Sequence, residues 1–537
     1  MIRRKLRMTT LLSVLLIGGL AAPNSSGAEE LLVAQAPSRP GAPARAGAAA
    51  PDGNNPLVQA LQMARSGNYV EASMSLFQLS YSPRFRNRRT QIRYILGLTL
   101  FEMNLNQVAA FQFISVVRQG ESQYLRQALE KLSLAADNLG DDTLLNYALG
   151  RVRVDDFPRI HRDMLNYRIG EFQLRNNQFP EAARSFSRVQ RASGLFPKAK
   201  YMEGLALTQA NQLPRALRAF EDLFDSRRAF GPTDSARVSA LMGMARVYYQ
   251  QRNWDRALDV YRQVPRDTEA WHDTLFESSW AMLRSGRFRS ALSNFHSLHS
   301  SYYEDFFIPE SLLLRSIVYL YICKYDEMEK VLNLFNQIYR PVYRQIDQAL
   351  NSTNDPVVYF NEMVRMIRDQ KLNDGSTEET RYLIPFLVGR RIMKEGDFQT
   401  SYNYISRLLE ETRRVVEMPA EWRQSAVGQY AQRVLQTRIA RARERAGRQI
   451  RAHLESIRLE LFDLFEQEGF IRFEMINGKK QALQKRIAGR DLPQTQVDEG
   501  TRRDYYIQNG FEYWPFRGEY WLDEIGNYHY VGTQSCD

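Results

Sequence analysis

Two tandem copies of one pattern, between residues 163 and 224, constrain the fold of this chain more than any other feature. Each position of the first copy recurs thirty-four residues later: Gly170, Asn177, Phe179, Ala182, Phe186 and Val189 are followed by Gly204, Asn211, Leu213, Ala216, Phe220 and Leu223. Small residues at this spacing let two helices approach closely, and the larger residues supply an apolar face that one helix pair cannot bury alone. The spacing therefore predicts stacked helix pairs.

This period, with small and aromatic residues at these positions, resembles the tetratricopeptide repeat (TPR). The resemblance implies an all-α fold, a TPR-type α-solenoid of helix–turn–helix units. In TPR arrays the first helix of each unit lines a concave surface that binds partners. The same register transferred along the chain gives these candidate groove residues: Tyr167, Glu171, Arg175, Tyr201, Gln209, Arg246, Tyr249, Gln250, Trp280 and Arg284. Aromatic anchors beside directional donors are typical of peptide recognition.

Composition and pattern divide the chain into six regions. They are a signal peptide (1–28), a disordered Ala/Pro/Gly-rich linker (29–54), the TPR solenoid (55–340), a divergent helical region (341–417), a long charged helix or a helical hairpin (418–488) and an aromatic-rich C-terminal region of short strands or coil (489–537). We expect the period to end at Pro341. A last, divergent helix pair is predicted at 383–394 and 398–411.

The first 28 residues have the organisation of a secretory signal. Basic residues between Arg3 and Arg7 precede the apolar run Leu11–Leu20, and the small residues Ser26 and Ala28 fit a cleavage site. We therefore expect export to the periplasm, and retention as an uncleaved anchor is the alternative. No cysteine follows the apolar run, so we do not expect a lipoprotein. Because export removes the chain from nucleic acid, no nucleic-acid partner is expected.

The C-terminal third carries a second resemblance. Its motifs are Leu461-Phe-Asp-Leu, Glu468-Gly-Phe-Ile-Arg-Phe-Glu, Gly489-Arg-Asp-Leu-Pro and the aromatic run from Tyr513 to Tyr528. Together with the repeats, these motifs resemble the exported TPR proteins of the bacterial adventurous gliding motility apparatus. That family implies a non-catalytic role in binding other envelope proteins, in gliding motility or in another envelope process.

The sequence lacks the common catalytic and metal-binding motifs. The sequence has no Gly-rich phosphate loop, no Gly-x-Ser-x-Gly and no His-Glu-x-x-His. His296 and His299 share one helix face, yet no third ligand has a suitable spacing. We therefore expect no enzyme activity, no cofactor and no metal.

Two further segments suggest additional partners. Ten arginines lie between Arg413 and Arg451, and this Arg-rich helical segment 413–451 is expected to bind an anionic membrane surface, peptidoglycan or an acidic partner, or to be a solvated helix face. Four tail aromatics could stack on cell-wall sugars or pack on the protein itself: Trp514, Tyr520, Trp521 and Tyr528. The two cysteines, Cys323 and Cys536, are equally compatible with a bridge and with free thiols, and an intermolecular bond through Cys536 is a third alternative.

Overall fold

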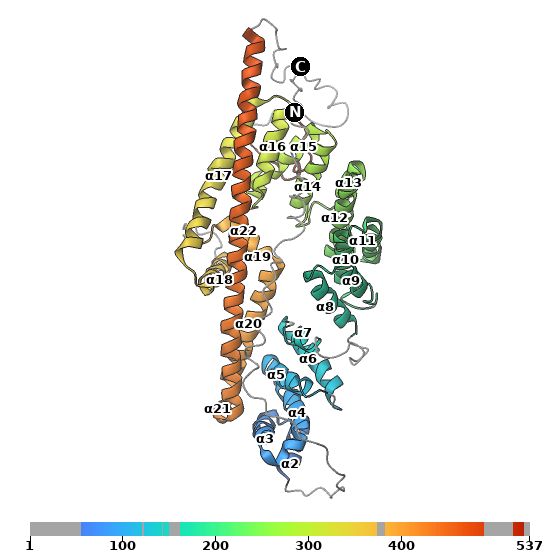
Figure 1. Ribbon diagram of the computed structural model, residues 1–537, viewed down its shortest axis with the longest axis vertical. Coiled ribbons are helices and arrows are strands. Elements are labelled where there is room, and N and C mark those ends of the chain that lie inside the picture. Colours follow the sequence, from blue (N-terminus) through green and yellow to red (C-terminus); the bar gives the residue numbers. More distant parts are fainter. Residues whose placement is uncertain are drawn as a thin grey trace. The chain divides into compact units, whose positions relative to one another are not determined.

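A computed structural model describes residues 55–120, 123–141, 143–149, 162–304, 306–372, 382–487 and 519–530. Every regular element in these residues is a helix (Figure 1), so the predicted all-α class is confirmed for this part of the chain. The predicted signal peptide and linker lie outside the described residues, as does most of the predicted C-terminal region.

The chain forms two compact units. The first takes its described residues from 1–168, 355–360 and 394–452, and the second from 169–354, 361–393 and 453–537. Each unit therefore contains successive helix pairs together with segments from later in the chain.

The repeats are helix pairs joined by short turns. In order, the pairs are α2 (Pro56–Arg65) and α3 (Tyr69–Tyr81), α4 (Arg89–Glu102) and α5 (Asn106–Val117), α6 (Leu125–Leu139) and α7 (Thr143–Leu149), α8 (Arg162–Arg175) and α9 (Phe179–Phe186), α10 (Phe196–Gln209) and α11 (Leu213–Ser226), α12 (Ser235–Gln250) and α13 (Trp254–Tyr261), α14 (Trp271–Arg284) and α15 (Phe288–Leu298), and α16 (Pro309–Tyr321) and α17 (Tyr325–Ser352). Three 3₁₀ turns, η3 (Pro83–Arg88), η6 (Arg228–Phe230) and η7 (Ser301–Tyr303), lie between pairs.

Glycines and aromatic rings set the distance between the helices of a pair. A Cβ atom on Gly204 of α10 would lie 2.5 Å from the ring of Phe220 on α11, and one on Gly243 of the next pair would lie 2.6 Å from the same ring. Phe220 is 1% exposed. The ring therefore fills the space that two missing side chains leave, and it joins one pair to the next.

The turn between the two helices of a pair uses a left-handed residue. Positive φ angles occur at Gly67, Asn104, Asn177, Asn211, Arg252, Gly286 and Cys323. Glycine and asparagine adopt this conformation at low cost. The Asn177–Asn211 repeat in the sequence therefore marks the turn geometry.

Three of these expectations differ from the helix ends in the structure. Helix α17, the second helix of its pair, continues through Pro341 to Ser352. The predicted last pair is not one repeat, because α19 (Phe386–Lys394) and α20 (Gly396–Glu417) fall almost wholly in different units. The Arg-rich segment 413–451 is not one helix: it spans the end of α20, all of α21 (Ala420–Gln424) and the start of α22.

Helix α22 (Ala426–Ile487) settles the choice between a long helix and a hairpin. It is a single helix of 62 residues, coloured orange to red in Figure 1, and neither Gly469 nor Gly478 interrupts it. Gly478 has a packing role, since a Cβ there would lie 2.4 Å from the Tyr325 ring. Helix α18 (Pro356–Leu372) completes the set.

In the first unit, the later helices pack on the early repeats. Trp422 of α21 is fully buried and donates its indole N–H to Ser73 Oγ of α3 at 2.8 Å. The carboxylate of Glu411, on α20, accepts the backbone N–H groups of Gln107 and Val108 at 2.9–3.2 Å. These groups lie in the first turn of α5, whose N–H donors have no partner within the helix. Glu411 therefore caps a repeat helix from a distant part of the sequence.

The stability of the first unit should depend on pH through Glu411. Burial raises the pKa of this carboxyl to about 7 from 4.5, although the hydrogen bonds from Gln107 and Val108 oppose the shift. Because the folded state holds the proton more tightly than the unfolded chain, stability is lost as pH rises between these values. Relative to a Glu411→Gln variant, the wild type should lose up to about 3 kcal/mol across this window. Thermal denaturation of both proteins at the two ends of the window measures it, and parallel pH curves would contradict it.

The described C-terminal residues, 519–530, pack on the pair α14–α15. The backbone N–H of Gly526 donates to Ser297 Oγ at 2.8 Å, and that of Tyr530 donates to Ser293 Oγ at 3.0 Å. Gly526 has φ +84°, and a Cβ there would lie 2.8 Å from the Trp271 ring. These twelve residues form turns and coil without a strand, and the rest of the predicted aromatic region lies outside the described residues.

Cys323 is disulfide-bonded, which excludes an unpaired thiol at this position. It lies at the turn between α16 and α17. The only other cysteine in the sequence, Cys536, lies outside the described residues.

Candidate protein-binding surface

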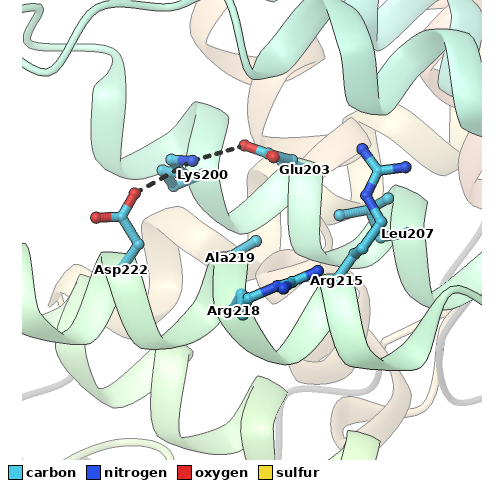
Figure 2. A pocket seen from close by; sticks show the side chains of 7 residues that line it. All are labelled: Lys200, Glu203, Leu207, Arg215, Arg218, Ala219 and Asp222. Atoms are coloured by element: carbon cyan, nitrogen blue, oxygen red, sulfur yellow. Dashed lines mark hydrogen bonds and ion pairs between the residues drawn. The ribbon is translucent and has the colours of Figure 1, made fainter.

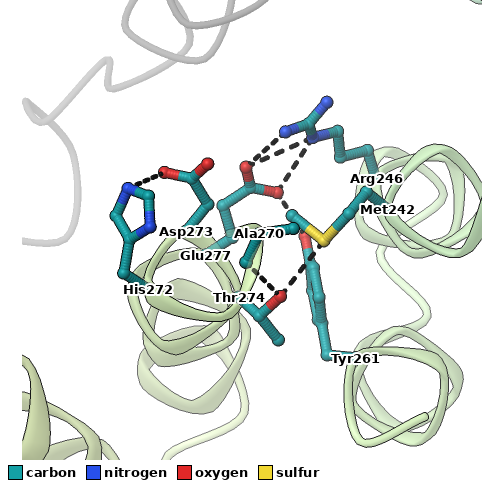
Figure 3. A network of polar contacts seen from close by, with 8 residues as sticks. All are labelled: Met242, Arg246, Tyr261, Ala270, His272, Asp273, Thr274 and Glu277. Carbon is teal, nitrogen blue, oxygen red and sulfur yellow. Dashed lines mark hydrogen bonds and ion pairs between the residues drawn. The ribbon is translucent and has the colours of Figure 1, made fainter. Parts of the chain in front are cut away.

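A polar network joins the first helices of two successive pairs in the second unit (Figure 3). Arg246 of α12 donates Nε and Nη2 to the two carboxylate oxygens of Glu277 on α14 at 2.7–3.2 Å. The hydroxyl of Tyr261, on α13, donates to the same carboxylate at 2.9 Å. The Arg246 and Glu277 side chains are 26% and 18% exposed. Such a bidentate pair fixes both side chains in position.

The pKa values in this network follow from burial and charge. Burial lowers the pKa of Arg246, but the charge and hydrogen bonds of Glu277 outweigh it and hold the pKa well above its usual value. Burial, followed by the charge of Glu277, raises the pKa of the Tyr261 phenol far above its usual value. Arg246 therefore stays charged and Tyr261 stays a neutral donor.

The network continues along neighbouring first helices. Tyr201 of α10 is close enough to Arg246 to raise its pKa. The Tyr249 ring, on α12, lies 4.9 Å from the Trp254 ring, and the positive charge of Arg284, on α14, opposes the burial that raises the pKa of the Tyr249 phenol. We call Tyr201, Arg246, Tyr249, Glu277 and Arg284 the A-helix surface. It offers two phenols, a fixed ion pair and an exposed guanidinium.

The candidate groove residues differ in exposure. Arg175, Gln250 and Arg284 are exposed; Glu171, Tyr201, Gln209, Arg246 and Tyr249 are half-buried; Tyr167 and Trp280 are buried. Tyr201, Arg246, Tyr249 and Arg284 are brought together through the contacts above. Tyr167 and Trp280 offer little surface to a partner.

Three relevant residues were not among the candidates. Glu277 and Tyr261 complete the network around Arg246. Glu310, at the start of α16, is 9% exposed, and its Oε1 atom has no hydrogen-bond partner in the described part of the chain. Burial, together with the charge of Glu460, raises the pKa of Glu310 to about 7. Glu277 and Glu310 could have been found in the sequence as acidic residues within the predicted first helices of their pairs.

A shallow pocket of about 310 Å³ lies between α10 and α11 (Figure 2). Lys200 in this pocket bonds Glu203 at 3.0 Å and Asp222 at 3.2 Å. Arg215 and Arg218 complete the charged lining. None of the candidate groove residues lines this pocket, and its acids are already paired with a base.

The Arg-rich segment 413–451 is divided between protein contacts and solvent. Arg438 lies over the Phe111 ring at 4.7 Å, and Arg445 pairs with Asp141 at 3.7 Å, both within the first unit. The side chains that remain exposed are Arg413, Arg414, Arg423, Arg433, Arg441 and Arg448. Part of the positive charge therefore serves packing, and part faces solvent.

The tail aromatics also differ. His296 of α15 has Tyr520 and Tyr528 at ring distances of 5.2 and 4.6 Å, so these two tyrosines pack on the repeats. Trp521 is 61% exposed. Trp514 lies outside the described residues.

The histidine pair has structural contacts. His299 lies 2.8 Å from Ser311 Oγ, and His296 lies under the tail tyrosines. Burial, followed by the charge of Arg315, lowers the pKa of His296 to about 4. The described residues contain no group of three or more metal-ligating side chains placed around one point. In the same residues, no helix has the length and apolar character needed to span a bilayer.

Comparison with known families defines the class of the repeats. The tetratricopeptide repeat model matches the chain twice, at residues 167–232 and 201–270. Residues 167–270 therefore contain tetratricopeptide repeats, as the thirty-four-residue spacing predicts. This stretch includes α9 to α13 and three residues of the A-helix surface.

Similar solved structures are distant. The apo form of RapI is 10% identical, with 64% of this chain and 98% of that chain covered and a TM-score of 0.35. A Rap protein complexed with competence and sporulation factor is 10% identical, with 73% and 98% covered and a TM-score of 0.28. The TPR domain of P58(IPK) is also 10% identical, with 71% and 98% covered and a TM-score of 0.17. No curated protein matches the chain.

Proposed function

We propose that this chain is a non-catalytic periplasmic scaffold whose A-helix surface binds a segment of another cell-envelope protein. The observation that carries the proposal is the Arg246–Glu277 ion pair, which joins the first helices α12 and α14 beside the half-buried Tyr249 and the exposed Arg284. Tetratricopeptide repeats suit protein–protein interaction, and phenols beside a guanidinium suit a peptide with acidic side chains. The periplasmic location rests on the secretory signal in residues 1–28.

The envelope complex we propose is the gliding-motility apparatus. Its support is the sequence resemblance of the C-terminal motifs alone. Fractionation of cells producing the full chain tests the location: recovery in the periplasmic or envelope fraction supports it, and recovery with the cytoplasm contradicts it.

Affinity capture from crosslinked envelopes tests partner binding. A Tyr249→Ala/Arg284→Ala variant should recover at least tenfold less partner than the wild type, because a half-buried phenol and an exposed charge are lost together. Arg289→Ala is the matched control, since Arg289 is exposed on the second helix of the pair that contains Arg284. Equal recovery by the double variant and the wild type would reject the A-helix surface.

A second candidate function is binding to peptidoglycan through the tail. The exposed Trp521 favours it, because an indole face can stack on a sugar ring. Sedimentation with purified sacculi should then depend on Trp521, and undiminished sedimentation of a Trp521→Ala variant would reject the tail as the binding element.

A further inference from the structure

The part of α22 in the second unit exposes six large apolar side chains to solvent. Their exposed fractions are 48–73%, and they are Leu459, Phe462, Phe470, Phe473, Ile476 and Leu483. The buried face of the same helix is occupied by Leu461, Leu464 and Met475. Contiguous exposed apolar side chains of this size mark an interaction surface.

Five of these six side chains follow a coiled-coil repeat, and Phe470 lies beside it. Alternating steps of three and four residues connect Glu455, Leu459, Phe462, Glu466, Gly469, Phe473, Ile476, Lys480 and Leu483. We call these nine positions the α22 stripe. From Leu459 to Leu483 it is about 36 Å long at 1.5 Å per residue. Steps of three and four keep a stripe facing a partner helix along its whole length.

The polar members of the stripe indicate the partner and its direction. In a parallel pair of two copies, Glu455, Glu466 and Lys480 would each face the same residue, which gives three layers of like charge. In an antiparallel pair, Glu455 faces Lys480 of a second copy, and Glu466 faces Gly469, where no side chain competes for space. The same register places Leu459 against Ile476 and Phe462 against Phe473. A single alignment therefore pairs apolar with apolar residues and acid with base.

We propose that the α22 stripe binds the α22 stripe of a second copy of this chain in an antiparallel pair. Gly469 supports the close approach that this pair requires, because a Cβ there would meet nothing within 4 Å in the monomer. The chain is thus a homodimer joined through α22.

Sedimentation of the full chain tests the dimer. The wild type should have twice the mass of one chain, and Phe473→Glu should halve it, because a charge then faces Phe462 and lies beside Glu466. Val416→Glu is the matched control: Val416 is 61% exposed on α20, and its replacement should leave the dimer intact. A monomeric wild type at micromolar concentration, or a dimeric Phe473→Glu variant, overturns the proposal.

Disulfide crosslinking tests the direction of pairing. A Glu455→Cys/Lys480→Cys variant should form a covalent dimer on oxidation, because the two positions face each other between copies and lie too far apart on one helix to bond. Glu455→Cys alone, Lys480→Cys alone and the wild type should remain uncrosslinked. Crosslinking of either single variant would mean parallel pairing and overturn the proposal, as would no crosslinking of the double variant.

Discussion

Replacing Phe220 with alanine is expected to destabilise the repeats around α11 by about 3–5 kcal/mol. The ring is almost fully buried, and it lies where Cβ atoms on Gly204 and Gly243 would be 2.5 and 2.6 Å away. No neighbouring side chain can therefore move in easily to fill the space. Because repeat stability depends on contacts between neighbours, the loss should appear as faster hydrogen exchange in α10, α11 and α12.

A double-mutant cycle separates this packing from helix propensity. Gly204→Ala should destabilise the wild type, since the new methyl group meets the Phe220 ring, although alanine favours a helix by about 1 kcal/mol. In the Phe220→Ala background the same change should be neutral or stabilising, because the ring is gone. Gly396→Ala is the control, because Gly396 lies in helix α20 and a Cβ there meets nothing within 4 Å. A stabilising Gly204→Ala change in the wild type would contradict the close approach.

Replacing Arg246 with alanine should destabilise the second unit by roughly 2–4 kcal/mol, because Glu277 is left without its ion-pair partner. This loss lies in the lower part of the range for a broken buried salt bridge, because the Arg246 and Glu277 side chains both keep some contact with water. Urea denaturation monitored by hydrogen exchange of α12–α14 measures the effect.

The matched control is an exposed pair in the same repeat. Arg262 and Asp259 lie 2.9 Å apart with side chains that are each 65% exposed. Arg262→Ala should therefore change stability by less than about 1 kcal/mol. In an Arg246→Ala/Glu277→Gln variant, part of the loss should be regained because the unpaired charge is gone. Equal effects of Arg246→Ala and Arg262→Ala would show that burial does not strengthen the Arg246 pair.

The repeats could be predicted from the sequence because their determinants are local. Gly204 and Phe220 are sixteen residues apart, as are Gly170 and Phe186, and each glycine faces the ring of its own pair. Asn177 and Asn211 also recur thirty-four residues apart, because both adopt the positive φ angle that the turn between two helices requires. Because each repeat has the same local steric requirements, the same residue types recur in the sequence at a fixed spacing.

The organisation of the two units could not be predicted, because it depends on contacts between distant segments. Nothing near Glu411 in the sequence indicates that it caps α5, about three hundred residues earlier. Pro341 illustrates a different limit: a proline usually ends a helix, but the apolar face of α17 is buried on both sides of it, at Tyr339 and Val342.

The candidate surface was predictable only in part. The repeat register places Arg246, Tyr249 and Arg284 on first helices, and the structure brings them together. The register does not determine which way a large aromatic side chain packs, and the predicted groove residues Tyr167 and Trp280 are both buried. The role of Glu277 is not visible in the sequence, because it depends on Arg246, which is thirty-one residues away and in the previous repeat.

Hydroxyl-radical footprinting with and without the captured partner tests the central claim, that the A-helix surface is the binding surface, most directly. Tyr201 and Tyr249 should be labelled less when the partner is bound, because their half-buried rings lose their remaining contact with water. Tyr302, which is 47% exposed outside this surface, should be labelled equally in both samples. Unchanged labelling of Tyr201 and Tyr249 in the complex would contradict the account.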